Sequence, residues 1–223
     1  MVGCLTLLNA IEKIEMTRQD MAELACRIEM VDLKKSSGKQ DQYTSAIGGI
    51  ARYTINTTGD VQVEPLHLSS SVIREIESSL FLYYSGVTRH SEPILSEQAS
   101  ALSRASEDPV TAMHKIQQIG IESGQALEAN DLNAFGELMH QHWLAKKMIS
   151  QNMSDPALDK PYEFARSIGA SGGKLIGAGG GGYWLFYVPA EKQREFRTKI
   201  GATGLLELTW KFEFHGCSVI YSN

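Results

Sequence analysis

The sequence has few cysteines and no long apolar run, and both absences narrow the kind of protein that it encodes. Its three cysteines, Cys4, Cys26 and Cys217, form no CxxC pair and are odd in number, which favours a reducing, cytoplasmic location over a disulfide framework. The apolar residues 1–11 are too few to span a bilayer, and neither a basic leader nor a cleavage site accompanies them. We therefore expect no signal peptide and no membrane segment.

An excess of positive charge is also missing. The 223 residues include 21 Lys and Arg against 26 Asp and Glu, for a net charge of -5, so no long-range attraction draws the protein to nucleic acid or to anionic lipid. Any phosphate site must then be local. The sequence also lacks a two-His metal helix, a GxSxG elbow and a Walker loop. Its length allows one large domain or two small ones.

Glycine, by contrast, is concentrated in one place. Of 20 glycines, eight lie between Gly169 and Gly182. Residues 177–182 separate two runs, 174–176 and 183–188, that are typical of buried strands. Such a cluster indicates positive φ angles or close backbone approach, and its N–H groups could form an anion nest. These residues alone are compatible with two interpretations: a phosphate-facing loop and a purely structural hairpin loop.

The first portion of the chain predicts an α+β arrangement. Apolar residues repeat at helical spacing from Val2 onward without an N-cap, and a second helix begins at the Thr17 cap and ends near residues 34–35. The polar segment SSGKQDQY that follows predicts a loop. After it, two strand-like runs, 50–55 and 61–66, predict a hairpin.

The remainder predicts helices on one face of an antiparallel sheet, which is an α+β sandwich. No internal repeat or low-complexity segment interrupts it. In chain order we expect a short helix at 70–77, a strand at 80–84, helices that begin at the Asp108, Asp131 and Asp155 caps, the strand, glycine loop and strand described above, a helix at 190–200, and a final hairpin of 205–214 with 217–221.

Two carboxylates, Asp41 and Glu29, are candidate site residues. Asp41 lies in the polar segment, two positions after Lys39, where it could act as a base for a substrate hydroxyl or be a solvated turn residue. Glu29, twelve positions before Asp41 and beside the apolar stripe of the second helix, could be a metal ligand or an ordinary solvated carboxylate. The residue types alone favour the ordinary interpretation of both.

Basic residues offer three further candidates. His142 and Lys146 lie on one face of a predicted helix, together with the apolar Met139. They are either a site pair or an ordinary helix flank, and the flank is favoured on these residues alone. Arg89, in the loop after the 80–84 strand, could grip a sugar or a phosphate or simply be solvated.

Four segments carry a likeness to a known family: SGKQDQY at 37–43, SGVTR at 85–89, HQHWLAKK at 140–147 and GGKLIGAGGGGYWLFY at 172–187. In this order they resemble the GHMP kinases, the family of galactokinase, homoserine kinase, mevalonate kinase and phosphomevalonate kinase. The likeness extends over nearly the whole chain and is nearest to the sugar-kinase branch that acts on D-glycero-D-manno-heptose 7-phosphate. It implies an α+β, GHMP kinase-like two-domain architecture, with an incomplete N-terminal domain at 1–70 and a C-terminal ferredoxin-like α/β sandwich at 71–223.

The resemblance implies a kinase that uses ATP and Mg²⁺ to phosphorylate a small-molecule sugar phosphate. Asp41 would take the proton of the sugar hydroxyl as it attacks the γ-phosphate, Lys39 would keep that carboxylate ionised, and Glu29 would help to hold Mg²⁺. The third motif of the family, which shapes the nucleotide phosphate loop, would comprise Gly177, Ala178, Gly179, Gly180, Gly181 and Gly182. The substrate contacts expected from motif position are Ser37, Gly38, Gln40, Arg89, His142 and Lys146.

One departure from the family limits this expectation. The Gly-Leu-Gly-Ser-Ser loop that holds the ATP phosphates in GHMP kinases has no match in the sequence, so we expect a chain that lacks the family's N-terminal third and is inactive alone. The missing strands would leave an open edge beside the 50–66 hairpin, which predicts poor solubility, a homodimer or dependence on a separate N-terminal chain. A non-catalytic assembly module is the competing hypothesis, and fucose, galactose or another small alcohol are the competing substrates.

Overall fold

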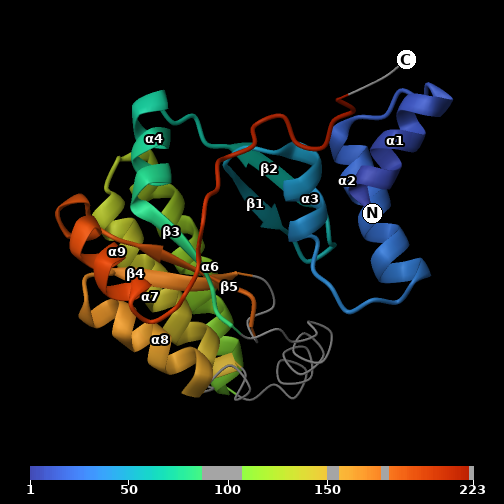
Figure 1. Ribbon diagram of the computed structural model, residues 1–223. Coiled ribbons are helices and arrows are strands. Elements are labelled where there is room, and N and C mark those ends of the chain that lie inside the picture. The colour runs from blue at the N-terminus through green and yellow to red at the C-terminus, as the bar shows by residue number, and fades with distance from the viewer. Residues whose placement is uncertain (87–106, 150–155, 177–180, 221–223) are drawn as a thin grey trace. The chain divides into compact units, whose positions relative to one another are not determined.

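A computed structural model describes four stretches of the chain: residues 1–86, 107–149, 156–176 and 181–220. The chain divides into two compact units (Figure 1). The first unit joins Met1–Leu66 to Lys211–Asn223, and the second is His67–Trp210. The expected boundary at residue 70 lies close to this division, but the expected second domain, 71–223, includes a tail that the structure assigns to the first unit.

The first unit combines helices and a hairpin in one core. Thr17 caps the second helix, as predicted, and it forms a reciprocal capping box with Asp20. The two strands pair antiparallel, which confirms the predicted hairpin. Met21, Cys26 and Tyr43 are buried in the core that these elements share. The elements are α1 Val2–Glu12, α2 Arg18–Arg27, the π-helix η1 Ile28–Asp32, α3 Gln40–Ile47, β1 Ala51–Ile55 and β2 Val61–Pro65.

The polar segment SSGKQDQY is not a continuous loop, because α3 begins inside it at Gln40. Tyr43 and Ala46 are only 2% and 1% exposed, so burial of one apolar face stabilises this helix. Asp41 accordingly lies in the first turn of α3 and not in a loop. The second helix was also predicted to end near residues 34–35, but α2 ends at Arg27 and the π-helix η1 follows it, where Val31 is 64% exposed.

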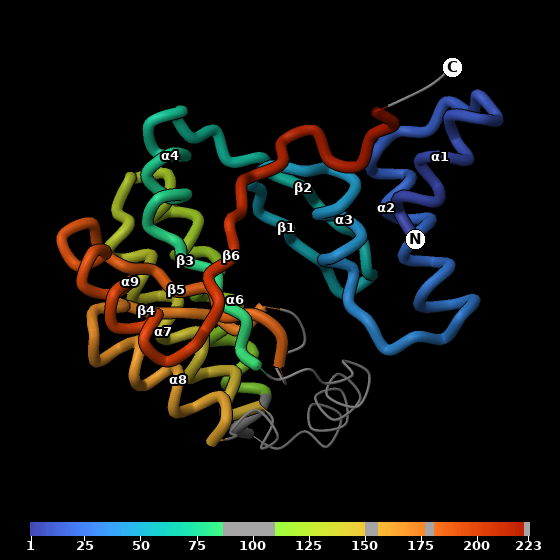
Figure 2. Tube along the Cα trace, in the orientation of Figure 1, coloured from blue at the N-terminus to red at the C-terminus, as the bar shows by residue number. Residues whose placement is uncertain are grey.

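The C-terminal tail is bound to the first unit by backbone hydrogen bonds. Gly49 N–H donates to Glu213 O at 2.6 Å, and Cys217 N–H donates to Ser45 O at 2.8 Å. Figure 2 shows this tail, coloured red, passing beside α3. Its backbone groups therefore have partners at the C-terminal end of α3 and in the residues that follow it.

The second unit is built on an antiparallel sheet with the strand order β4-β5-β3-β6. The strand predicted at 80–84 and the two strands predicted around the glycine loop are confirmed. None of the described helices is long and apolar enough to cross a membrane. The elements are α4 Ser70–Ser79, β3 Leu80–Tyr84, α6 Glu107–Glu128, α7 Leu132–Ile149, α8 Pro156–Ser167, β4 Gly172–Ile176, β5 Tyr183–Tyr187, the 3-10 helix η3 Ala190–Lys192, α9 Gln193–Gly201 and β6 Glu207–Leu208.

The predicted final hairpin is wrong. Of its described residues, only Glu207–Leu208 form a strand, and that strand pairs with β3. The apolar composition of 205–214 suited a longer strand, and His215 with Gly216 suited a turn. After the turn, Cys217 N–H donates to Ser45 O of the first unit, and the chain does not fold back on 205–214. Pairing with a segment so distant in sequence cannot be predicted from local periodicity.

An aromatic core joins the sheet of the second unit to its helices. Trp143 of α7 meets Trp184 of β5 edge-on, with ring centroids 4.8 Å apart. Tyr162 of α8 lies with its ring centroid 5.1 Å from that of Trp184. Aromatic pairs in such arrangements add about 0.5–1.5 kcal/mol to the free energy gained by burying their area. Both α7 and α8 are therefore fixed against the sheet.

Helix α7 lies close along β4 because glycines line the contact. A Cβ atom on Gly172 would overlap Gly136 O and His140 N of α7, and a Cβ atom on Gly136 would overlap the ring of Tyr187. Two backbones can approach this closely only where a side chain is absent. The contact determines which residues of α7 face which residues of β4.

Candidate active site

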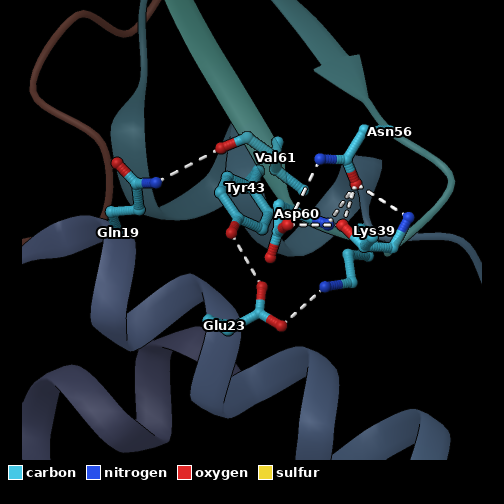
Figure 3. A network of polar contacts seen from close by, with 8 residues as sticks. Gln19, Glu23, Lys39, Tyr43, Asn56, Asp60 and Val61 are labelled. Carbon is cyan, nitrogen blue, oxygen red and sulfur yellow. Dashed lines mark hydrogen bonds and ion pairs between the residues drawn. The ribbon is translucent and has the colours of Figure 1, made fainter.

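Glu23 is the centre of a polar network in the first unit (Figure 3). Lys39 Nζ donates to Glu23 Oε1 at 2.6 Å, and Tyr43 OH donates to Glu23 Oε2 at 2.7 Å. Burial acts to raise the pKa of Glu23, but the two hydrogen bonds outweigh it and lower that pKa. Burial, and then the bond to Glu23, raise the pKa of Tyr43. Glu23 therefore links α2 to both the start and the interior of α3.

Lys39 has a different partner from the one that the family resemblance implied. It was expected to keep Asp41 ionised, but the ion pair that the described residues give Lys39 is with Glu23. The Lys39 side chain is 17% exposed, so the pair is partly shielded from solvent. Lys39 is also the N-cap residue of α3. Its contact with Glu23 thus fixes the beginning of the helix that carries Asp41.

Hydrogen bonds also fix the β1–β2 hairpin beside this network (Figure 3). Gln19 Nε2 donates to Val61 O at 3.2 Å, which ties α2 to the first residue of β2. At the turn, Asn56 Oδ1 accepts from Asp60 N–H at 2.8 Å, and Asn56 Nδ2 donates to Asp60 Oδ2 at 3.2 Å. Side chains of Asn and Asp commonly close turns in this way. The hairpin turn is thus closed by its own side chains, and one hydrogen bond joins β2 to α2.

Asp41 and Glu29 come from different segments, and Gln42 connects them. Gln42 Nε2 donates to Glu29 Oε2 at 2.6 Å. Asp41, the neighbour of Gln42 in the first turn of α3, is exposed and makes no hydrogen bond or ion pair within the described part of the chain. The helix dipole stabilises a carboxylate in this position. An exposed carboxylate without a partner is available to accept a proton from a substrate.

Glu29 lies in the π-helix η1, a local geometry that is frequent at functional sites. Its side chain is 19% exposed, and its Oε1 atom lies 3.7 Å from the Met1 amine. Across the described ranges, no group of three His, Cys, Asp or Glu side chains gathers that could hold a metal ion. Mg²⁺ at nucleotide sites commonly takes one or two carboxylates together with phosphates and water. Glu29 fits the role of a single protein ligand to an Mg²⁺ ion that arrives with a nucleotide.

The other expected substrate residues of this segment, Ser37, Gly38 and Gln40, precede Asp41 in the sequence. Gly38 and Gln40 are exposed. Ser37 Oγ is buried and has no hydrogen-bond partner among the described residues. A buried hydroxyl without a partner carries a desolvation cost that a bound polar ligand would relieve. Residues 37–41 therefore combine exposed residues, a buried hydroxyl without a partner among the described residues, and the exposed carboxylate of Asp41.

The second unit holds a basic cluster on α7 and β4. His142 and Lys146 lie one turn apart on α7, and Lys174 lies in β4. Burial, and then the charges of Lys174 and Lys146, lower the pKa of His142 to about 3. Burial, and then the charge of Lys174, lower the pKa of Lys146 to about 8. His142 and Lys146 were expected from the sequence, and the structure adds Lys174 to them.

The glycine-rich third motif is described only at its end. Gly182 has a φ angle of 102°, which favours glycine. Its carbonyl accepts a hydrogen bond of 2.8 Å from Ser85 N–H, so the end of the loop is tied to the end of β3. Gly181 precedes it within the described residues. Five expected site residues lie outside the described residues: Arg89, Gly177, Ala178, Gly179 and Gly180.

Three residues of these clusters were not predicted as site residues: Glu23, Gln42 and Lys174. For Gln42 a signal existed, because Tyr43 and Ala46 have the spacing of a buried helical face. For Lys174 the signal was a lone cation inside a predicted buried strand. Glu23 gave none, since its partners lie on segments that only folding brings to it.

Comparison with known proteins gives a consistent picture. Residues 125–203 match the family model described as GHMP kinases C terminal. The D-glycero-α-D-manno-heptose 7-phosphate kinase of Campylobacter jejuni is 33% identical over 174 residues, which is 78% of this chain and 51% of that protein. The L-fucokinase/L-fucose-1-P guanylyltransferase of Bacteroides fragilis is 26% identical over 206 residues, which is 87% of this chain and 21% of that protein.

A solved structure agrees with these relatives. The D-glycero-D-manno-heptose 1-phosphate kinase from Bacteroides thetaiotaomicron superposes with a TM-score of 0.75 at 26% identity. The alignment covers 99% of this chain and 61% of that structure. The chain therefore spans about half the length of the curated heptose 7-phosphate kinase that it matches, and it has the mixed helix and sheet fold of these kinases.

Proposed function

Because the chain belongs to the GHMP kinase family, we propose that it acts in the ATP-dependent phosphorylation of a hydroxyl on a sugar or sugar phosphate. One observation carries the proposal. The hydrogen bond of 2.6 Å from Gln42 to Glu29 ties a carboxylate suited to Mg²⁺ to the helix whose first turn presents Asp41. Phosphoryl transfer depends on positioning and on charge neutralisation, and this pair of carboxylates suits both needs.

Asp41 is the proposed general base. Its exposed carboxylate accepts the proton of the attacking hydroxyl. The hydroxyl oxygen forms a bond to the γ-phosphorus of ATP while the bond from that phosphorus to the bridging oxygen breaks, and ADP leaves. Glu29 would hold Mg²⁺, which when bound neutralises charge on the phosphates. The ion pair of 2.6 Å between Lys39 and Glu23 has an indirect role, because it positions the start of α3, the helix that carries Asp41.

A sugar phosphate is the proposed acceptor. The relatives from Campylobacter jejuni and Bacteroides thetaiotaomicron are named as kinases of heptose phosphates. The relative from Bacteroides fragilis is named as a fucokinase, so fucose is the second candidate. The sequence contains no Gly-Leu-Gly-Ser-Ser loop. We therefore propose that the transfer requires a nucleotide phosphate loop in addition to these 223 residues.

The test is the release of ADP from Mg-ATP with heptose 7-phosphate, heptose 1-phosphate, fucose and galactose as acceptors. The assay uses this chain by itself and this chain fused to the part of the Campylobacter jejuni kinase that it does not match. We expect turnover by the fused protein with a heptose phosphate and little turnover by this chain alone. A folded fused protein that binds Mg-ATP and phosphorylates none of the four acceptors would refute the kinase proposal.

Two matched variants of the fused protein test the base. Asp41→Asn should lower kcat by about 10²–10⁴-fold, the usual contribution of a positioned base. Asp32→Asn makes the same change at another exposed carboxylate and should leave kcat unchanged. A kcat that survives Asp41→Asn, or falls equally in both variants, would remove Asp41 from the proposed role.

A further inference from the structure

Three basic side chains gather in the second unit where α7 lies along β4. The contact of Gly172 with Gly136 O and His140 N brings these two elements together. Lys174 is two residues beyond Gly172, so its side chain leaves the strand on the same face, toward α7. The strand rises about 3.3 Å per residue and the helix about 1.5 Å. Where the two elements run in the same direction, Lys174 comes level with His142.

The contacts show that β4 and α7 do run in the same direction. Gly172 meets Gly136 of α7, whereas Leu175 pairs with Trp184, whose ring meets Trp143 further along α7. His142 and Lys146 are four positions apart and so lie on one face of α7. The three side chains therefore converge from two elements whose backbones are fixed against each other. This rigidity distinguishes the cluster from basic residues scattered on a solvated surface.

Two groups of the cluster, His142 Nδ1 and the Lys146 ammonium, have no polar partner among the described residues. His142 Nδ1 is buried and has no hydrogen-bond partner among the described residues. Lys146 forms no ion pair or hydrogen bond with any residue that the structure describes. The next lysine of the same helix, Lys147, differs, since its Nζ atom lies 2.7 Å from Asp159 Oδ1. Partly buried groups of like charge raise the free energy of the fold unless an anion joins them.

We propose that His142, Lys146 and Lys174 bind the phosphate group of the acceptor sugar phosphate, an inference that rests on the proposed function. The two ammonium groups supply charge to the phosphate oxygens. Neutral imidazole supplies one ring N–H donor. A compact phosphate monoester can accept hydrogen bonds from all three groups at once through its three terminal oxygens.

Charge balance favours the acceptor phosphate over the phosphates of ATP. The nucleotide enters with Mg²⁺, which already neutralises part of its charge. A sugar phosphate enters without a metal ion and is close to a dianion at neutral pH. A dianion is stabilised by nearby cations, and Lys146, which has no ion pair among the described residues, supplies one beside Lys174. The cluster thus offers positive charge to this substrate.

Equilibrium binding tests the site without turnover. The full 223-residue chain is titrated with inorganic phosphate and with D-glycero-D-manno-heptose 7-phosphate by calorimetry, while NMR follows the imidazole ¹⁵N resonances of His142. We expect both ligands to bind and to shift the His142 resonances, and the unphosphorylated heptose to do neither. Lys146→Gln and Lys174→Gln should each weaken heptose 7-phosphate binding by about tenfold or more.

The matched control is Lys160→Gln, which removes the same charge from an exposed position on α8 and should leave both dissociation constants unchanged. Circular dichroism checks that each variant is folded. The rise in Tm on adding phosphate gives a second readout for a variant of lower stability, because a ligand of the native state stabilises it. Unchanged affinity in both Lys146→Gln and Lys174→Gln, or an equal loss in Lys160→Gln, would overturn the inference.

Competition identifies the source of the phosphate. Heptose 7-phosphate should displace inorganic phosphate from His142, and Mg-ATP should not. Displacement by Mg-ATP alone would overturn the assignment to the acceptor. The outcome is separate from the kinase assay: phosphate binding at His142 by a protein without kinase activity would refute only the proposed function. A kinase whose KM for the sugar phosphate is unchanged in Lys146→Gln would refute only this inference.

Discussion

Gln42 Nε2 donates a hydrogen bond of 2.6 Å to Glu29 Oε2, and this contact joins the π-helical turn after α2 to helix α3. Gln42 is 6% exposed, whereas its neighbour Asp41 is exposed. Adjacent residues thus have different tasks, since one fixes the backbone and the other presents a carboxylate. The candidate site depends on this contact because it relates Glu29 to Asp41.

Loss of that contact should destabilise the first unit. Gln42→Leu keeps a side chain of similar size but removes the Nε2 donor to Glu29. A hydrogen bond to a charged group contributes about 1.5–3 kcal/mol to stability. We expect the free energy of unfolding in urea to fall by about that amount. Gln40→Leu changes an exposed glutamine of the same turn and should alter stability by less than about 0.5 kcal/mol. Equal effects of the two substitutions would contradict the assigned role of Gln42.

Glu23 predicts a dependence of stability on acid pH. Its pKa in the folded protein lies below the ordinary value of 4.5. The stabilisation is therefore fully present above about pH 4.5 and is lost as the pH falls through the folded pKa. Because the Glu23 side chain is 51% exposed, the effect should stay below about 1 kcal/mol. Urea unfolding between pH 7 and pH 3 should show a smaller acid loss in Glu23→Gln than in Glu12→Gln, which alters an exposed carboxylate.

His142 predicts a second acid effect, of different origin. Its pKa is about 3 in the folded protein and 6.5 ordinarily. Between these pH values the unfolded chain binds a proton at His142 that the folded protein does not bind. Stability is then lost as the pH falls from about 6.5 toward about 3, by about 1–2 kcal/mol at pH 5. His142→Asn should remove this loss, measured by urea unfolding in phosphate-free buffer. His114→Asn, at an exposed histidine of α6, should retain it, and identical pH profiles for the two variants would count against the buried state of His142.

Gly172 should tolerate no side chain. In Gly172→Ala the new Cβ atom meets backbone atoms of Gly136 and His140, so α7 must move away from β4 at a cost of about 1–3 kcal/mol or more. Gly120→Ala is the matched control, because nothing lies near a Cβ atom there and alanine in a helix interior gains about 0.5–1 kcal/mol over glycine. Thermal unfolding should give a lower Tm for Gly172→Ala and a higher Tm for Gly120→Ala. A Tm for Gly172→Ala at or above that of the parent would show that α7 and β4 are less tightly packed.

Much of the fold could be predicted from local patterns. Caps and hydrophobic runs act within a few residues, and they predicted the Thr17 cap, the 80–84 strand and the two strands around the glycine loop. The patterns failed where partners are distant. The polar segment around Asp41 forms a helix because Tyr43 is buried in the core of the first unit. In place of the predicted final hairpin, residues of the tail form hydrogen bonds with the first unit.

The sequence by itself determined the family, since its motifs occur in the order of the GHMP kinases and residues 125–203 match that family's C-terminal model. It also determined Asp41, Glu29, His142 and Lys146 as the residues to consider. Only the tertiary structure decided their partners: Glu23 for Lys39, Gln42 for Glu29, and Lys174 for the α7 pair. The physical reason is that helices and strands depend on neighbours in sequence, whereas ion pairs, buried hydrogen bonds and charge clusters depend on which distant segments pack together.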